Sequence, residues 1–171
     1  IILAGEPLPK TLVDKIKAII PGIQVFNGYG PSETTIFSTF ANVTEQKEIT
    51  IGKPINNTQI YILNKNKKLM PQGTIGELYI SGDGIGKGYI NKEKQTQENF
   101  IQNPFNTEKI MYKVGDLGTY NENGEIMCYG RIDNQVKIRG LRIELTEIEK
   151  QMQEIYNIHD CVVEKKTSKR K

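Results

Sequence analysis

Hydrophobic positions at the start of the chain change from a strand pattern to a helix pattern and back. Residues 1–4 (IILA) form an apolar run that predicts a buried strand, and apolar residues between positions 12 and 20 recur at the spacing of one helical face. Pro21 and Gly22 end this helix. Residues 23–26 predict a second strand, which leads into the polar loop NGYGPSETT and an extended segment at 36–40. This order predicts a parallel strand–helix–strand unit.

From about residue 48 to residue 130 the hydrophobic period changes to two, which is the period of strands. Strands are expected at residues 58–63, 76–81, 116–120 and 125–129. Asn123 and Gly124 stand between the last two runs, and an Asn-Gly pair between alternating segments is a strong hairpin signal. We therefore expect a small antiparallel sheet or open barrel in the middle of the chain.

The last part of the chain predicts a hairpin, a helix and a strand. Residues 136–145 predict two short, half-buried strands that turn at Gly140. A helix is expected from Glu147 to about Tyr156, with Thr146 as its N-cap and Glu149 at the capping-box spacing. A strand is expected at residues 161–164. The fold class is therefore α+β.

The net charge of +3 comes from one end of the chain. Residues 161–171 carry a net charge of +4, whereas the 160 residues before them carry a net charge of −1. Short basic tails can bind phosphate backbones, but most are simply solvated. We therefore expect no nucleic acid as a partner.

The composition argues against disulfide, histidine-based metal and membrane chemistry. Cys128 and Cys161 are too few for a disulfide framework and lack metal-ligand spacing, and His159 is the single histidine. The mean hydropathy is −0.48, and no apolar run reaches the roughly 18 residues that a membrane span needs. We expect no membrane partner and a cytoplasmic location.

The loop at residues 27–35 is a candidate for chemistry because it follows a strand of the α/β unit, where such folds bind ligands. Gly28 and Gly30 let the backbone approach a ligand, and Tyr29 between them offers an aromatic face. Ser32 offers a hydroxyl to phosphate, and Glu33 offers a hard carboxylate to Mg²⁺. The alternative is an ordinary turn with capping hydroxyls.

Three further segments carry unusual combinations of residues. Asp116, in the string YKVGDL, is either a turn former or a carboxylate that accepts hydrogen bonds from both ribose hydroxyls. Residues 130–149 (GRIDNQVKIRGLRIELTEIE) interleave charged and apolar positions, which by itself is typical of a charged hairpin before a surface helix. Residues 76–89 (GELYISGDGIGKGY) lack the Gly-Lys-Ser/Thr ending of a phosphate loop, so we expect their glycines to serve tight strand turns.

Taken in their order along the chain, these four segments resemble the motifs of the adenylate-forming enzymes, specifically the amino-acid-activating adenylation domains of nonribosomal peptide synthetases. The resemblance covers essentially the whole chain. It implies that residues 1–131 are the C-terminal portion of the large domain, an α/β unit plus a distorted antiparallel barrel. It also implies that residues 132–171 begin the small C-terminal domain.

The resemblance implies an ATP-dependent ligase that joins a carboxylate to AMP, releases pyrophosphate and passes the acyl group to a phosphopantetheine thiol. ATP, AMP and Mg²⁺ are then the implied ligands, an amino acid is the substrate and a peptidyl carrier protein is the partner. The resemblance places Tyr29 on adenine and Asp116 on the ribose, with Arg131 in the ribose and phosphate region. It places Ser32 at the α-phosphate and Glu33 at Mg²⁺.

The resemblance also implies a hinge, a tunnel and a pocket. Asp133 matches the residue about which the small domain rotates, and Arg139 and Gly140 match a turn that lines the tunnel for the phosphopantetheine arm. The pocket for the amino-acid side chain is implied to be lined by Ile2, Ala4, Gly28, Ile36 and Phe37. Plain core packing is the alternative for these five positions.

The resemblance is incomplete in two respects. Val114 replaces the usual threonine of its motif, so this chain has no side-chain hydroxyl there to contact the nucleotide. The family's phosphate loop and catalytic lysine match no residue of this chain, so we expect no catalytic residue in it and much slower adenylation by these residues alone. An acyl-CoA synthetase of the same superfamily and a non-catalytic nucleotide-binding remnant stay open as alternatives, although residues 133–140 (DNQVKIRG) favour the peptide synthetase branch.

Overall fold

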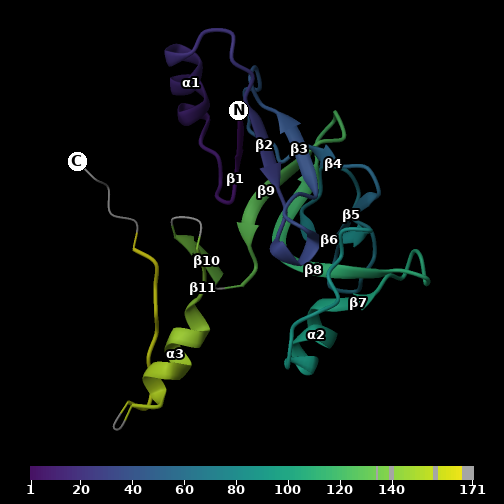
Figure 1. Cartoon of the computed structure of the whole chain (residues 1–171). Coiled ribbons are helices and arrows are strands. Elements are labelled where there is room, and N and C mark those ends of the chain that lie inside the picture. The colour runs from purple at the N-terminus through teal and green to yellow at the C-terminus, as the bar shows by residue number, and fades with distance from the viewer. Residues whose placement is uncertain (134, 139–140, 156–157, 167–171) are drawn as a thin grey trace. The chain divides into compact units, whose positions relative to one another are not determined.

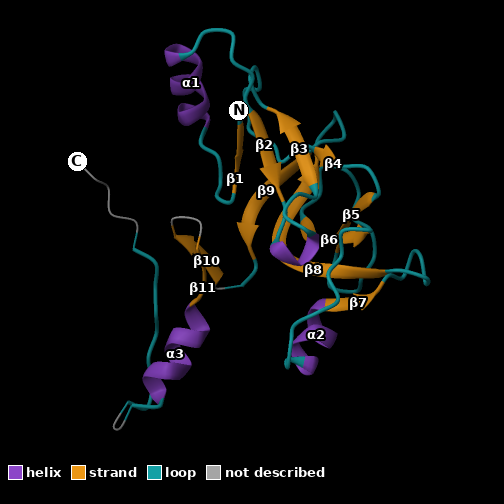
Figure 2. Ribbon diagram, in the orientation of Figure 1, coloured by secondary structure: helices purple, strands orange, loops and turns teal. Residues whose placement is uncertain are grey.

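A computed structural model describes residues 1–133, 135–138, 141–155 and 158–166 of the chain. It divides into two compact units, Ile1–Ile132 and Asp133–Lys171. Each unit is described by itself. Figure 1 labels the helices and strands, and Figure 2 distinguishes them from the loops. No helix in the described ranges is both long enough and apolar enough to cross a membrane.

The first unit begins with a four-stranded sheet in the order β1-β2-β3-β4. Its strands are β1 (Ile2–Ala4), β2 (Phe26–Tyr29), β3 (Thr39–Asn42) and β4 (Lys53–Pro54). The helix α1 (Lys10–Ile19) connects β1 to β2, which pair in parallel. Val13 on α1 is fully buried against a cluster that contains Val25 and Val43. The predicted strand–helix–strand unit is confirmed.

Two details of this unit differ from the prediction. The strand β1 is not buried, because Ile2 is 56% exposed. The strand β2 begins at Phe26, so Asn27, Gly28 and Tyr29 belong to a strand and not to a loop. Pairing on both sides explains this second difference, since β2 hydrogen-bonds to β1 along one edge and to β3 along the other. Tertiary pairing here outweighs the low strand propensity of Asn and Gly.

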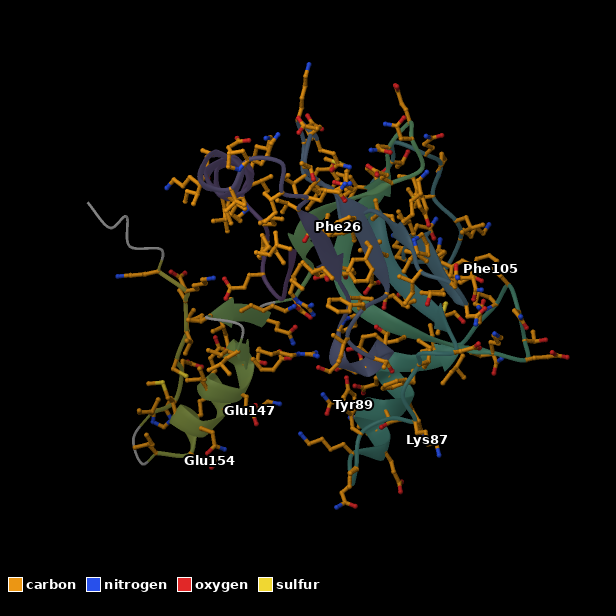
Figure 3. The ribbon with its side chains drawn as sticks, turned by 45° about the horizontal axis from the view of Figure 1, so that its top comes forward. Phe26, Lys87, Tyr89, Phe105, Glu147 and Glu154 are labelled. Carbon is orange, nitrogen blue, oxygen red and sulfur yellow. The ribbon has the colours of Figure 1, made fainter. Side chains whose placement is uncertain are left out.

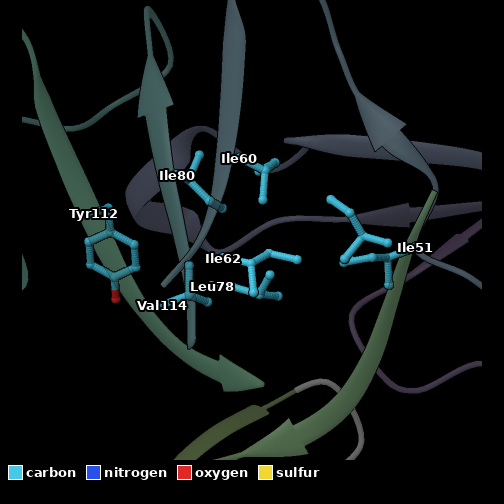
Figure 4. Packing of buried hydrophobic residues seen from close by; sticks show 8 residues of the cluster. Ile51, Ile60, Ile62, Leu78, Ile80, Tyr112 and Val114 are labelled. Carbon is cyan, nitrogen blue, oxygen red and sulfur yellow. The ribbon is translucent and has the colours of Figure 1, made fainter. Parts of the chain in front are cut away.

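The first unit continues with a five-stranded antiparallel sheet in the order β5-β6-β8-β7, with β9 also paired to β8. Its strands are β5 (Thr58–Leu63), β6 (Gly76–Gly82), β7 (Phe100–Gln102), β8 (Ile110–Tyr120) and β9 (Ile126–Arg131). The four predicted strands and the hairpin at Asn123-Gly124 are confirmed, although β8 begins six residues earlier than expected. The core of this sheet consists of buried aliphatic side chains together with Tyr112, and Ile51 also belongs to it (Figure 4).

The first unit also contains short elements that the hydrophobic pattern does not reveal. The helix α2 (Glu93–Asn99) has no buried residue, so it lacks the apolar stripe by which helices are recognised. It leads directly into β7, which is three residues long. A single turn of 3₁₀ helix, η1 (Ser32–Thr34), lies inside the predicted polar loop.

The second unit contains β10 (Gln135–Ile138), β11 (Leu141–Glu144) and α3 (Leu145–Gln153). The two strands form the predicted hairpin, and its turn, Arg139 and Gly140, lies outside the described residues. The prediction of Thr146 as N-cap is wrong, because α3 begins at Leu145 and Glu144 occupies the N-cap position. The helix also ends at Gln153 and not near Tyr156.

The predicted strand at 161–164 is absent from the structure, which describes these residues without regular secondary structure. Side-chain bonds hold the segment to α3. The Cys161 thiol donates to the Glu149 carbonyl at 3.2 Å, and the Val163 amide donates to Glu149 Oε1 at 3.0 Å. Val162 is 82% exposed, so the alternation of apolar residues here does not reflect burial.

Candidate functional site

Tyr29, Asp116 and Arg131 form one hydrogen-bonded cluster in the first unit, although they come from three strands and two sheets. The Tyr29 hydroxyl donates to Asp116 Oδ2 at 2.5 Å. Arg131 Nη1 donates to Asp116 Oδ1 at 3.1 Å, and Arg131 Nη2 donates to the Val114 carbonyl, also at 3.1 Å. The structure therefore brings together the three residues that the sequence assigns to adenine and ribose.

The register of the β8–β9 hairpin places Arg131 opposite Asp116. Gly118 pairs with Cys128, but Leu117 pairs with Gly130, so Tyr129 is an extra residue in β9. An extra residue shifts all later side chains to the other face of the strand. Without it, Asp116 would face Gly130. This β-bulge therefore gives the aspartate its arginine partner.

The surroundings of the cluster fix its charges. The Asp116 and Arg131 side chains are only 13% and 17% exposed, so their ion pair is partly shielded from solvent. Burial first, and then the negative charge of Asp116, raises the pKa of Tyr29 well above its ordinary value. Tyr29 is therefore neutral at physiological pH, and its hydroxyl donates to the carboxylate. The cluster is a carboxylate held in one orientation by two donors.

Val114 contributes its backbone and not its side chain to this region. The side chain is 4% exposed and belongs to the main hydrophobic core. A threonine at this position would therefore carry its hydroxyl on a side chain that packs in the core. The carbonyl of Val114 accepts the second bond from Arg131 and so helps to fix the guanidinium.

Ser32 and Glu33 lie on η1, the turn that follows β2. Ser32 is exposed, and its backbone carbonyl accepts the Thr35 amide at 3.2 Å. One carboxylate oxygen of Glu33, Oε1, accepts a 2.7 Å hydrogen bond from the Tyr89 hydroxyl. The sequence pattern did not single out Tyr89 for this contact, because it stands at the end of a glycine-rich stretch that predicts only turns.

The backbone after η1 is strained. Thr35 and Ile36 have φ values of +62° and +69°, in the left-handed region that β-branched residues rarely adopt. The Phe37 amide closes this bend on the Thr35 carbonyl at 2.8 Å, and the Ser38 amide returns to the Tyr29 carbonyl at 2.8 Å. The bend separates the Ser32–Glu33 turn from β3.

Internal packing is sufficient to explain Gly28 and Gly30. A Cβ on Gly28 would lie 2.7 Å from the Phe37 ring, and a Cβ on Gly30 would lie 2.6 Å from the Ile36 carbonyl oxygen. The structure therefore requires both glycines for contacts inside the protein. Whether a ligand also approaches them stays a prediction.

The residues predicted to line a substrate pocket are only partly brought together. Ala4 pairs with Gly28 across β1 and β2, and the Phe37 ring lies against Gly28. Ile2 lies two residues from Ala4 on β1, and Ile36 lies on the strained bend. Ile2 and Ile36 are 56% and 65% exposed in the described structure. The role of the five residues in a substrate pocket stays a prediction.

Asp133 is the first residue of the second unit. It is exposed, lies in a bend between β9 and β10, and accepts the Gln135 amide through Oδ1 at 3.2 Å. Its role as a hinge stays a prediction. Arg139 and Gly140, the predicted tunnel residues, lie outside the described residues.

An open groove of about 600 Å³ lies on the second unit, along β11 and α3. It is lined by Arg142, Ile143, Glu144, Glu147, Ile148, Gln151, Met152 and Ile155. None of the residues predicted to bind nucleotide or substrate lines it. Among the described residues, no group of three or more acidic, histidine or cysteine side chains is arranged to hold a metal.

Comparison with known proteins identifies the same family as the sequence motifs. Residues 1–90, about half of the chain, match the family of AMP-binding enzymes. The chain is 45% identical to gramicidin S synthase 2 of Aneurinibacillus migulanus over 162 residues, which cover 94% of this chain and 4% of that protein. It is also 46% identical to surfactin synthase subunit 3 of Bacillus subtilis over 167 residues, or 95% of this chain and 13% of that protein.

Solved structures share the fold. PA1221, an NRPS protein containing adenylation and PCP domains, matches 94% of this chain at 30% identity with a TM-score of 0.84. The chain spans 34% of that protein and a few per cent of most of the synthetases it resembles. The resemblance to adenylation domains and the mixed α+β fold class are thus confirmed. The chain belongs to the family of AMP-binding enzymes.

Proposed function

We propose that this chain is part of an amino-acid-activating adenylation domain, an ATP-dependent ligase of a nonribosomal peptide synthetase. In the proposed reaction the amino-acid carboxylate attacks the α-phosphorus of ATP and pyrophosphate leaves. The aminoacyl group of the resulting adenylate then passes to the phosphopantetheine thiol of a peptidyl carrier protein. The similarity to gramicidin S and surfactin synthases and to the PA1221 structure supports this proposal.

The observation that carries the proposal is the joined cluster of Tyr29, Asp116 and Arg131. A ribose presents two neighbouring hydroxyls, and a carboxylate held in one orientation can accept hydrogen bonds from both. Tyr29 supplies an aromatic ring beside that carboxylate, and adenine stacks well on such a ring. Arg131 adds a fixed positive charge where the ribose leads to the phosphates. We assign these three side chains to adenosine.

The η1 turn supplies the remaining polar groups. We assign the exposed hydroxyl of Ser32 to the α-phosphate and the carboxylate of Glu33 to Mg²⁺. A lone carboxylate suits Mg²⁺ that arrives with the nucleotide, because this ion usually takes one or two carboxylates together with substrate phosphates. Bound there, Mg²⁺ would neutralise charge on the phosphate oxygens. The Tyr89 hydroxyl that contacts Glu33 donates a hydrogen bond to Oε1 and adds no charge to the turn.

The remaining assignments follow the motif matches. We assign Asp133 to a hinge between a large domain that ends near residue 131 and a small domain. We assign Arg139 and Gly140 to the entry path of the phosphopantetheine arm. The pocket for the amino-acid side chain is assigned to Ile2, Ala4, Gly28, Ile36 and Phe37.

The proposal is tested by amino-acid-dependent ATP–pyrophosphate exchange in the full-length protein that carries this chain, screened across amino acids and fatty acids. We expect exchange with one or a few amino acids, and a loss of at least about 100-fold in Asp116→Ala, since a charge-assisted hydrogen-bond pair contributes about 3 kcal/mol. Exchange with fatty acids alone would favour an acyl-CoA synthetase. Absence of exchange with both classes would contradict the proposal.

A further inference from the structure

Tyr89 contacts Glu33 from 56 residues further along the chain. Its hydroxyl donates to Glu33 Oε1 at 2.7 Å. Because the one hydroxyl proton goes to Glu33, the neighbouring Tyr112 hydroxyl, 3.3 Å away, acts as donor to Tyr89.

Three elements hold Tyr89 in place. Its backbone amide donates to Thr96 Oγ1 on α2 at 2.8 Å. The edge of its ring meets the ring of Phe100 on β7, with centroids 5.5 Å apart and planes at 75°. Tyr112 on β8 is 2% exposed and packs against Phe100 in turn, at 5.0 Å between centroids. Figure 3 labels Tyr89 in the segment that precedes α2. The hydroxyl that reaches Glu33 is therefore carried by an anchored ring.

The glycine-rich loop before Tyr89 is bonded to the backbone around Glu33. The Gly86 amide donates to the Glu33 carbonyl at 2.8 Å, and Thr35 Oγ1 donates to the Gly84 carbonyl at 2.8 Å. A Cβ on Gly84 would lie 2.9 Å from the Thr34 carbonyl oxygen, so a side chain there would push the loop away. The expectation that these glycines serve only strand turns is therefore incomplete, since two of them allow the loop to dock on η1.

We propose that Tyr89 is a positioning residue for Glu33, which fixes the direction of the carboxylate while the residue 82–89 loop fixes its backbone. A glutamate side chain has several rotamers of similar energy unless a partner selects one, and Mg²⁺ demands near-ideal octahedral geometry. Hydrogen-bonded partners of metal ligands commonly change metal affinity or activity about 10- to 100-fold when they are removed. Tyr89 thus connects the core formed by Phe100 and Tyr112 to the metal-binding turn.

This inference rests on the proposed function of Glu33, so the experiment separates the two. ATP binding is measured calorimetrically without amino acid, at a series of Mg²⁺ concentrations, in the full-length protein that carries this chain. The variants are Glu33→Gln, Tyr89→Phe and the double variant. Tyr120→Phe is the matched control, because its hydroxyl donates to the Ile60 carbonyl at 2.9 Å and does not contact Glu33. Exchange activity and melting temperature are followed in parallel.

We expect Tyr89→Phe to raise the Mg²⁺ concentration for half-maximal ATP binding about 10-fold, with Tyr120→Phe unchanged. The double variant should be no weaker than Glu33→Gln alone, because both changes act through one carboxylate. A shift in Glu33→Gln but none in Tyr89→Phe, or additive shifts, would overturn the positioning role. No shift in Glu33→Gln would overturn the metal assignment itself. If Tyr89→Phe does not fold, Gly84→Ala replaces it, because its Cβ would push the loop that carries Tyr89 away from η1. An unchanged Mg²⁺ requirement in that variant overturns the inference.

Discussion

At the scale of single residues, the site depends on one extra residue in a strand. Tyr129 breaks the regular register of β8 and β9, and only then does Arg131 face Asp116. The aspartate consequently has a partner on each oxygen, Tyr29 on one and Arg131 on the other. Removal of one member of a partly buried ion pair leaves the other uncompensated, which costs up to several kcal/mol. We therefore regard stability and nucleotide recognition as linked at Asp116.

Buried tyrosines make the chain sensitive to alkaline pH. The pKa values of Tyr29, Tyr79, Tyr89 and Tyr120 are all raised, with burial as the first cause in each case. Above the ordinary value of 10, the unfolded chain loses these protons while the folded chain keeps them. The folded state then binds more protons, so stability is fully present below pH 10 and falls above it.

We expect the free energy of unfolding in urea to fall by at most about 1.4 kcal/mol per pH unit for each such tyrosine above pH 10. Tyr29→Phe should make this slope shallower. Equal slopes in the wild type and Tyr29→Phe would contradict the assigned burial of the Tyr29 hydroxyl.

At the scale of elements, the start of α3 is a point where the structure differs from the sequence prediction. Thr146 and Glu149 have the spacing of a capping box, but α3 begins one residue before Thr146. Glu149 instead reaches forward to the Val163 amide. The strand β11 ends at Glu144, which is also the N-cap residue of α3, and the Glu144 side chain makes no capping hydrogen bond.

We therefore expect Thr146→Ala to leave the hydrogen-exchange protection of α3 unchanged. Loss of a true N-cap would lower helix stability by about 1 kcal/mol. Glu149→Ala should speed exchange of the Val163 amide about 5-fold, which corresponds to the loss of one hydrogen bond of about 1 kcal/mol. Glu149→Gln, which keeps an acceptor oxygen, is the control. Faster exchange throughout α3 in Thr146→Ala would instead support the predicted capping box.

The same elements show what the sequence could reveal about the fold. Strands with clear alternation and a strong turn, such as β5 and the β8–β9 hairpin, are where the pattern predicts them. The shift of β2 and the absence of a strand at 161–164 depend on which partners are available, and a local pattern does not contain that information. The helix α2 has no buried residue, so its sequence shows no helical period of hydrophobic residues.

The candidate site also combines features that the sequence predicts with features that it does not. Tyr29, Asp116 and Arg131 were identified separately from their motifs, and the structure brings them into contact. The bulge that aligns them could not be predicted, because Tyr129 and Gly130 do not differ locally from a regular strand end. Tyr89 was missed for a similar reason, since its partner Glu33 lies 56 residues away.

At the scale of the whole molecule, the first unit, Ile1–Ile132, contains every residue that we assign to adenosine, phosphate and Mg²⁺. We therefore expect this chain alone to retain adenosine affinity. Stacking on one aromatic ring plus a pair of ribose hydrogen bonds contributes on the order of 2–4 kcal/mol. That free energy corresponds to a Kd in the millimolar range or weaker.

The central claim is that Tyr29, Asp116 and Arg131 form the adenosine site, and NMR titration of the chain with AMP tests it most directly. We expect millimolar binding, with the largest shifts at these three residues, similar affinity for ATP, and loss of binding in Asp116→Ala. Asp14→Ala is the control, because it removes an exposed carboxylate from α1 whose ion-pair partner among the described residues is Lys10. Unchanged AMP binding in Asp116→Ala, or shifts confined to other residues, would contradict the account.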